Sequence, residues 1–68
     1  MSRPLIGIVC GPHFENGTLF YGLMPSYASS IAAAGGLPVL IVPVVDETTL
    51  RETYERMDAV LMAGGADV

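Results

Sequence analysis

The sequence contains no lysine and no tryptophan, and its 68 residues include one cysteine and one histidine. A disulfide framework needs pairs of cysteines, and a structural zinc site needs four Cys or His ligands, so one chain can build neither. No phosphate-binding loop of the G-x-x-x-x-G-K or G-x-G-x-x-G type is present. We therefore predict that the chain holds no metal and no cofactor.

Charge is also scarce, and most of it is acidic. Charged residues make up 15% of the chain, and three arginines face seven Asp and Glu residues, for a net charge of -4. Nucleic-acid binding requires a patch of basic side chains, so no nucleic-acid partner is expected. No apolar run is long enough for a signal peptide or a bilayer span, so we expect no membrane partner and a cytoplasmic location, with which a single free thiol agrees.

The third shortage is length. A chain of this size buries only about 60% of the surface that its unfolded form exposes, yet 51% of its residues are hydrophobic. A short, apolar and weakly charged chain is typical of a piece whose surface is covered by further polypeptide. We therefore expect residues 1–68 to be the N-terminal part of a single domain, with the remainder of that domain absent from this chain.

Three apolar runs alternate with two helical segments. The runs cover residues 5–10, 37–43 and 59–63, and the helices are predicted at 27–34 and from about 46 or 49 to 56. Apolar runs without polar alternation are typical of strands that are buried on both faces of a parallel sheet. The order predicts an α/β fold, namely the β-α-β-α-β N-terminal portion of a doubly wound, flavodoxin-like parallel sheet.

The helix ends can be predicted from capping residues. Ser26 is the expected N-cap of the first helix, and Gly35-Gly36 is its expected C-terminal stop. For the second helix, Asp46 and Thr49 are equally good N-caps, Thr49 because Glu52 follows it as in a capping box.

A long segment, residues 11–24, follows the first predicted strand. It exceeds ordinary connections between a strand and a helix, and loops of this length are usually functional or disordered. Phe14, Phe20 and Tyr21 give it the aromatic character of a lid, although packing against a neighbouring loop or subunit explains them equally well. Ligands bind beyond the carboxyl ends of the strands in such sheets, where this segment is expected to lie.

Gly64-Gly65 follows the third predicted strand and is the sharpest local feature. Glycine lets a backbone N–H approach a developing oxyanion and tolerates positive φ, but a plain turn would also suit this pair. Beside it, Ala66 and Asp67 are candidate substrate contacts, with helix capping as the alternative role of Asp67.

Cys10 and His13 offer a nucleophile and a base three residues apart. Cys10 does not lie in a Gly-x-Cys-x-Gly nucleophile elbow, and a cysteine at a strand end is more often a small buried hydrophobe. We therefore assign no catalytic role to this pair.

Three segments, in this order, resemble one family. Residues 3–8 look like its opening strand, residues 27–40 like its first helix and second strand joined by Ala-Gly-Gly-x-Pro, and residues 58–68 like its third strand with a Gly-Gly-x-Asp-Val turn. The family is the gamma-glutamyl-gamma-aminobutyrate hydrolase group of class I glutamine amidotransferase-like proteins. The resemblance covers nearly the whole chain except residues 15–24.

The resemblance implies a hydrolase that cleaves γ-glutamyl amide bonds, such as those of γ-glutamyl-GABA, through a Cys-His-Glu triad. The triad lies C-terminal to residue 68 in that family, so these residues alone are expected to be inactive. Gly65 would supply one oxyanion-hole N–H, and Gly64 would permit the turn. The expected partners are a small-molecule γ-glutamyl substrate and further copies of the full-length protein in a homo-oligomer.

Two other classes of protein remain open at this stage. A small-molecule ligand-binding module of the periplasmic-binding-protein or LacI-like type also begins with a strand, a long ligand-contacting loop and the same order of elements. A complete structural or interaction protein is the other alternative, in which case the third strand would be an exposed apolar edge that needs a pairing partner.

Overall fold

The computed structural model describes residues 2–62. It contains five strands and two helices in that range, in the order β1 (Leu5–Val9), β2 (Gly11–Glu15), β3 (Thr18–Gly22), α1 (Pro25–Ala33), β4 (Leu37–Ile41), α2 (Glu47–Glu55) and β5 (Ala59–Met62). The three apolar runs are strands β1, β4 and β5, and the two helical segments are α1 and α2, as predicted.

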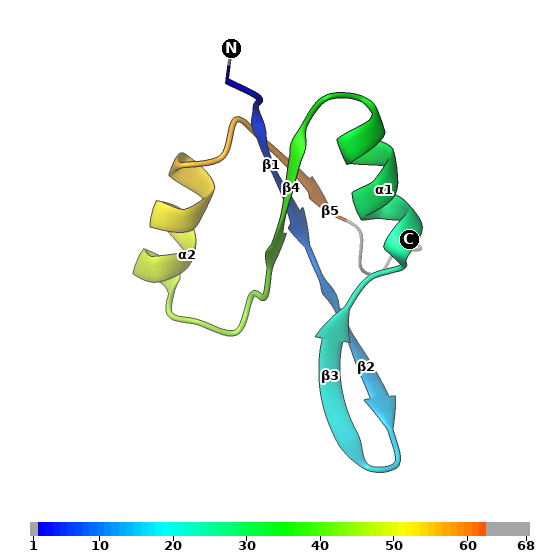
Figure 1. Cartoon of the computed structure of the whole chain (residues 1–68). Helices are drawn as coiled ribbons and strands as arrows, with labels where there is room; N and C mark the ends of the chain where they lie inside the picture. The colour runs from blue at the N-terminus through cyan, green and yellow to red at the C-terminus, as the bar shows by residue number, and fades with distance from the viewer. Residues whose placement is uncertain (1, 63–68) are drawn as a thin grey trace.

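Strands β4, β1 and β5 form one parallel sheet in that spatial order. At the carboxyl end of the sheet Val9 pairs with Ile41 on one side and with Met62 on the other. Figure 1 shows α1 and α2 on opposite sides of this sheet. Helices on both faces of a parallel sheet define a doubly wound α/β architecture, which confirms the predicted flavodoxin-like N-terminal portion.

The core is small and centres on β1. Ile8, Val9 and Cys10 are buried, together with Ile41 of the neighbouring strand. A run without polar residues suits β1 because a strand lies against each of its edges and a helix covers each side of the sheet. Every residue of β5 is exposed, since no strand among residues 2–62 pairs with its outer edge.

The start of α1 differs from the prediction. The N-cap is Met24, whose side chain makes no capping bond, and Pro25 occupies the first helical position. Ser26 therefore lies inside the first turn and is not the cap. Proline is well suited to that first position because its fixed φ matches the helix and its missing N–H would have no partner there.

The C-terminal end of α1 is as predicted and has an additional partner. Gly35 ends the helix with φ +99, a left-handed conformation that favours glycine. The guanidinium of Arg3 donates to the carbonyl oxygen of Ala32, in the last turn of α1, at 3.4 Å. It also donates to the carbonyl oxygens of Gly35 and Gly36, just after the helix, at 3.2 and 2.8 Å. Because the last carbonyls of a helix lack partners within it, this arginine fastens α1 to the segment that leads into β1.

Asp46 is the N-cap of α2, which decides between the two predicted caps. Its carboxylate accepts from the backbone N–H of Thr49 at 3.0 Å and from the Thr49 hydroxyl at 2.6 Å. Thr49 is thus a partner of the cap and not the cap itself. Along the helix, Nη2 of Arg51 lies 3.7 Å from Oε2 of Glu47, and both side chains are exposed.

Residues 11–24 do not form a single loop, which corrects the prediction. Strands β2 and β3 pair as an antiparallel hairpin, from Gly11 opposite Gly22 to Glu15 opposite Thr18. Only Leu23 and Met24 then connect the hairpin to α1. Neither of the helices described here is long and apolar enough to cross a membrane.

Gly7 provides a test of packing on β1, against Ile41 of β4 and against Met57 in the segment between α2 and β5. A Cβ atom at Gly7 would lie 2.6 Å from Cδ1 of Ile41 and 3.0 Å from Cγ of Met57. Because Ile41 is itself buried, we expect Gly7→Ala to lower the free energy of unfolding by about 1–3 kcal/mol. Urea unfolding measures this loss. The control is Gly22→Ala, since a Cβ at Gly22 meets nothing within 4 Å. Equal stability of the two variants would contradict the packing.

Asp46 makes the stability of α2 depend on pH. The Thr49 hydroxyl and then the Thr49 backbone N–H lower the pKa of Asp46 from its ordinary value of 3.8. The folded state therefore binds the carboxyl proton of Asp46 less tightly than the unfolded state does. The cap stabilises the helix fully at pH values above the unfolded pKa of Asp46, and this stabilisation is lost as the pH falls through the folded pKa. We expect the Thr49 amide resonance to titrate below pH 3.8 in the wild type and not in Asp46→Asn, which keeps an acceptor but does not ionise. A wild-type midpoint above this value would contradict the prediction.

Candidate functional site at the carboxyl edge of the sheet

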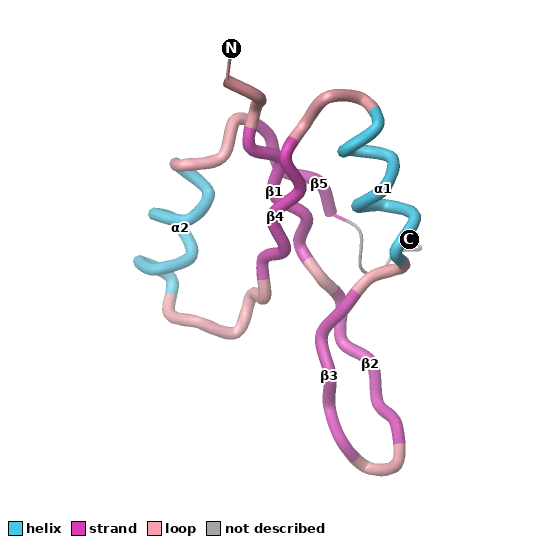
Figure 2. Tube along the Cα trace, viewed as in Figure 1, coloured by secondary structure: helices cyan, strands magenta, loops and turns pink. Residues whose placement is uncertain are grey.

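The hairpin leaves the sheet at the edge where ligands bind in open α/β folds. Strand β1 ends at Val9, and the backbone N–H of Cys10 donates to the carbonyl oxygen of Ile41 at 2.9 Å, which extends the pairing by one residue. The chain then enters β2. Figure 2 shows β2 and β3 extending away from the parallel sheet as a separate ribbon. The hairpin is thus anchored directly to the most buried strand of the molecule.

A tight turn determines the shape of the hairpin. Asn16 has φ 53 and Gly17 has φ 78, and both lie between the last paired residues of β2 and β3. Positive φ at both central residues is the signature of a type I′ turn, and Asn-Gly is its preferred sequence. This dipeptide is the signal in the sequence that would have predicted the hairpin.

A pair of glycines creates an open hollow at the base of the hairpin. Gly11 lies opposite Gly22, and the next pair on the same face of the ribbon is His13 opposite Phe20. Because the glycine pair has no side chains, a depression of about 490 Å³ opens beside His13 and Phe20. We call this depression the hairpin hollow; its lining residues are Gly11, Pro12, His13, Phe20, Tyr21, Gly22, Leu23, Met24 and Pro25.

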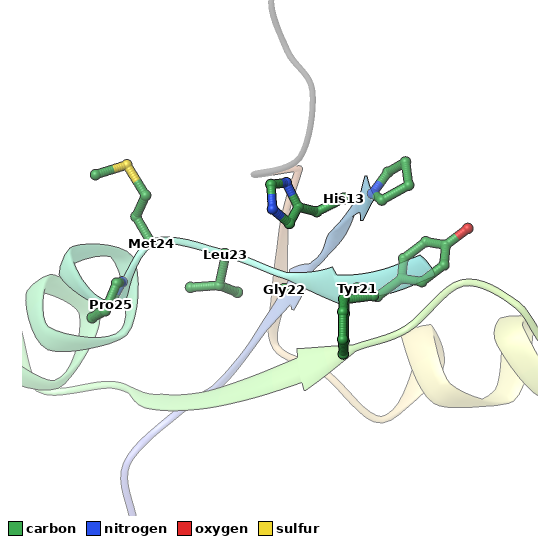
Figure 3. A pocket seen from close by; sticks show the side chains of 9 residues that line it. His13, Tyr21, Gly22, Leu23, Met24 and Pro25 are labelled. Atoms are coloured by element: carbon green, nitrogen blue, oxygen red, sulfur yellow. The ribbon is translucent and has the colours of Figure 1, made fainter. Parts of the chain in front are cut away.

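His13 is the only basic side chain that lines the hairpin hollow. Its Nε2 atom lies 3.9 Å from Oε1 of Glu15, and both side chains are 67% exposed. Figure 3 shows the imidazole extending from β2 toward the side on which Met24 lies. The remaining side chains of the lining are aromatic or aliphatic, and Tyr21 adds a hydroxyl, so the hollow is a largely apolar surface with polar groups on His13 and Tyr21.

Cys10 and His13 do not form a nucleophile and base pair. Cys10 is 3% exposed, and its thiol points to the carbonyl oxygen of Ile8 at 3.9 Å. His13 instead projects from the exposed hairpin. The interpretation of Cys10 as a small buried hydrophobe is confirmed.

The aromatic residues of the hairpin differ in their surroundings. Phe14 is 71% exposed and Phe20 is 51% exposed, whereas Tyr21 is half-buried. Phe20 and Tyr21 line the hairpin hollow, but Phe14 does not. The structure therefore places two of the three predicted lid aromatics at one depression.

Four predicted site residues, Gly64, Gly65, Ala66 and Asp67, lie outside the described residues. Strand β5 can be followed to Met62, which pairs with Val9 at the carboxyl edge. Within residues 2–62, no group of three or more His, Cys, Asp or Glu side chains is placed to hold a metal ion.

These features define an open, doubly wound α/β protein whose β1 exit carries a hollowed hairpin at the ligand-binding edge. A comparison with protein-family models matches residues 4–68 to the family described as Peptidase C26. The chain therefore belongs to the Peptidase C26 family, which places it in the class I glutamine amidotransferase-like superfamily of hydrolase and amidotransferase-like enzymes. Neither the curated proteins nor the solved structures gave a match. The family match does not favour a ligand-binding module of the periplasmic-binding-protein or LacI-like type.

The turn gives a test of how the hairpin is held in shape. Gly17→Val places a β-branched side chain at φ 78, so we expect the paired structure of β2 and β3 to be weakened. Amide hydrogen exchange in the two strands should speed up by about fivefold or more, which corresponds to about 1 kcal/mol of lost local stability. Asn16→Gly is the control, because glycine accepts the same positive φ. Unchanged exchange in Gly17→Val would rule out the type I′ turn.

Proposed function

We propose that this protein, in its complete form, hydrolyses γ-glutamyl amide bonds, with γ-glutamyl-γ-aminobutyrate as the substrate type that the sequence resemblance indicates. The observation that carries the proposal is the family match over residues 4–68, which spans nearly the whole chain. Enzymes of this class act on γ-glutamyl type amides. The order β4-β1-β5 supports the proposal because open parallel sheets of this kind bind their ligands beyond the carboxyl ends of the strands.

The proposed chemistry requires a Cys-His-Glu triad C-terminal to residue 68. The thiolate attacks the γ-carbonyl carbon, the histidine transfers the thiol proton to the leaving amine, and water then hydrolyses the acyl-enzyme to release glutamate. Residues 1–68 contribute none of the three groups in this scheme, so the chain by itself is expected to be inactive.

Gly65 is proposed to contribute one backbone N–H to the oxyanion hole, with Gly64 permitting the turn. Strand β5 supports this assignment because its last described residue, Met62, lies at the carboxyl edge beside Val9. A glycine suits the role because a side chain would obstruct the approach of the carbonyl oxygen. Ala66 and Asp67 are proposed to contact the glutamyl part of the substrate.

Residues 1–68 are proposed to form the N-terminal part of a single glutamine amidotransferase-like domain. Val60, Leu61 and Met62 support this proposal because all three are exposed on β5, with Met62 at 76%. An exposed apolar edge strand is an aggregation hazard unless another strand or helix covers it. A cytoplasmic location and a homo-oligomeric assembly of the full-length protein complete the proposal.

The complete gene product tests the oxyanion assignment. Gly65→Pro removes the backbone N–H, and we expect kcat for γ-glutamyl-γ-aminobutyrate to fall by about 100- to 1,000-fold. Gly65→Ala keeps the N–H and serves as the control, with a smaller loss that arises only from the added methyl group. Glutamate release measures both rates, and circular dichroism shows whether each variant is folded. If folded Gly65→Pro retains the wild-type kcat, Gly65 has no such role.

If the wild-type gene product releases no glutamate from any γ-glutamyl amide, the proposed function itself is wrong. Translating the codons downstream of Val68 gives an independent check. We expect a Gly-x-Cys-x-Gly type elbow about 40–60 residues later, at a strand-to-helix turn.

A further inference from the structure

Strand β3 has one edge that no described strand covers. Strand β2 pairs with its other edge, and within residues 2–62 no further strand lies beside it. Figures 1 and 2 show the hairpin of β2 and β3 extending away from the parallel sheet. A two-stranded hairpin by itself is marginally stable in water, and an uncovered edge is a template for pairing with another strand. The hairpin is therefore expected to gain stability when a further strand joins it.

The register of the hairpin shows which backbone groups are free on that edge. Opposite residues of an antiparallel pair alternate between pairs that exchange both backbone hydrogen bonds and pairs that exchange none. A type I′ turn closes with a hydrogen bond between the residues that flank it, here Glu15 and Thr18. By this alternation Leu19 and Tyr21 belong to pairs that exchange none, so their N–H and C=O groups point away from β2. Pro12, which lies opposite Tyr21, agrees with this assignment because proline has no N–H to donate.

The two outer edges of the hairpin differ in how they are protected against pairing. Strand β2 contains Pro12, whose missing N–H belongs to the outer edge, and the ionisable side chains of His13 and Glu15. Proline and charged side chains are the usual means by which proteins protect a strand edge. Residues 18–24 contain no proline and no Asp, Glu, His, Lys or Arg. The outer edge of β3 is therefore the edge that is open to pairing.

The side chains of β3 are complementary to a second copy of the same strand. When two β3 strands lie antiparallel about a two-fold axis at Tyr21, Phe20 of each copy lies opposite Gly22 of the other, and Leu19 lies opposite Leu23. Phe20 is 51% exposed, and a Cβ atom at Gly22 would meet nothing within 4 Å, so each copy offers both a ring and open space for one. The hairpin hollow of about 490 Å³ includes that space. An aromatic ring opposite a glycine restores the cross-strand contact that the glycine lacks.

We propose that β3 pairs edge to edge with β3 of a second copy of this protein, antiparallel about a two-fold axis at Tyr21. The inference rests on the homo-oligomeric assembly in the proposed function and names its surface, and it does not depend on hydrolase activity. In this register each Tyr21 donates its backbone N–H to the carbonyl oxygen of the other, and Phe20 of each copy fills the hairpin hollow of its partner beside Gly22. The contact closes at two copies because the same patch serves on both sides.

A matched pair of proline substitutions in the complete gene product tests which edge pairs. Tyr21→Pro removes the outward N–H at the two-fold axis and leaves the hydrogen bonds between β2 and β3 intact. We expect the dissociation constant of the dimer, measured by sedimentation velocity over a concentration series, to rise by about tenfold or more, because two symmetric hydrogen bonds are lost. Phe14→Pro is the control, since it removes an outward N–H from the other edge of the hairpin. Its dissociation constant should stay within about threefold of the wild-type value.

A cross-link tests the register and decides the question if the proline variants do not fold. The Cα atoms of residues in a hydrogen-bonded antiparallel pair lie about 5.5 Å apart, within the range that a disulfide spans. Tyr21→Cys should therefore form a covalent dimer under mild oxidation, seen by electrophoresis without reductant. Phe14→Cys, which is also on the hairpin but far from the proposed axis, should remain uncross-linked. The wild-type protein shows the background from its other cysteines, of which Cys10 is buried.

The outcomes separate this inference from the proposed function. A dimer that is weakened by Tyr21→Pro alone, or cross-linked through Tyr21→Cys alone, supports the pairing of β3. An assembly that neither substitution affects overturns the inference and leaves the homo-oligomer standing on another surface. A monomer at every concentration overturns the pairing and the homo-oligomer together; a Tyr21→Cys thiol that is then shielded from a maleimide indicates that the protein's own chain covers β3. Hydrolysis of γ-glutamyl amides is measured separately and is unaffected by any of these results.

Discussion

The structure depends on the burial of β1 between two parallel neighbours. Ile8 of β1 is fully buried. Both connections of the chain, through α1 to β4 and through α2 to β5, return to the edges of this one strand. Burying apolar surface stabilises a protein by about 25 cal/mol per Å². Because few side chains of the described residues are buried, the core contributes only a small stabilising free energy. Gly7 contributes by its lack of a side chain, because Met57 and Ile41 occupy the space that a Cβ atom there would need. The same strand then fixes where the hairpin begins, because only Cys10 separates Val9 from the start of β2 at Gly11.

Most of the parallel sheet could be predicted from the sequence, because burial on both faces leaves an apolar run that is visible without any neighbour. The strand ends Val9 and Ile41 lie within one or two residues of the predicted ends, and Gly35 ends α1 as expected. The helix starts were harder to predict. Ser26 and Thr49 have favourable side chains for capping, but the backbone rotation that decides which residue caps is fixed by Pro25 in one helix and by Asp46 in the other.

The hairpin was missed because its residues lack the pattern of a buried strand. His13, Phe14 and Glu15 are all exposed, so burial imposes no alternation on them. The structure of this segment is determined instead by the turn, where Asn16 and Gly17 both adopt positive φ. The hairpin hollow could not be predicted at all from single residues. It arises from the register that sets Gly11 opposite Gly22, and register is a property of two strands together.

The two edges of the sheet use polar groups differently, and this difference shapes the chemistry that the carboxyl edge can perform. At the amino edge, Arg3 binds carbonyl oxygens in the last turn of α1 and just after it, and Asp58 accepts from the backbone N–H of Leu5 at 2.7 Å. These charges serve to fasten helices and strands. At the carboxyl edge Asp46 is engaged with Thr49, and the only acidic or basic side chains of the hairpin are His13 and Glu15, 3.9 Å apart between Nε2 and Oε1. No arginine of the described residues lines the hairpin hollow, where the surface consists of apolar groups, backbone, the His13 imidazole and the Tyr21 hydroxyl. A family whose chemistry stabilises an oxyanion with backbone N–H groups is compatible with such an edge, since those donors need no charged side chain.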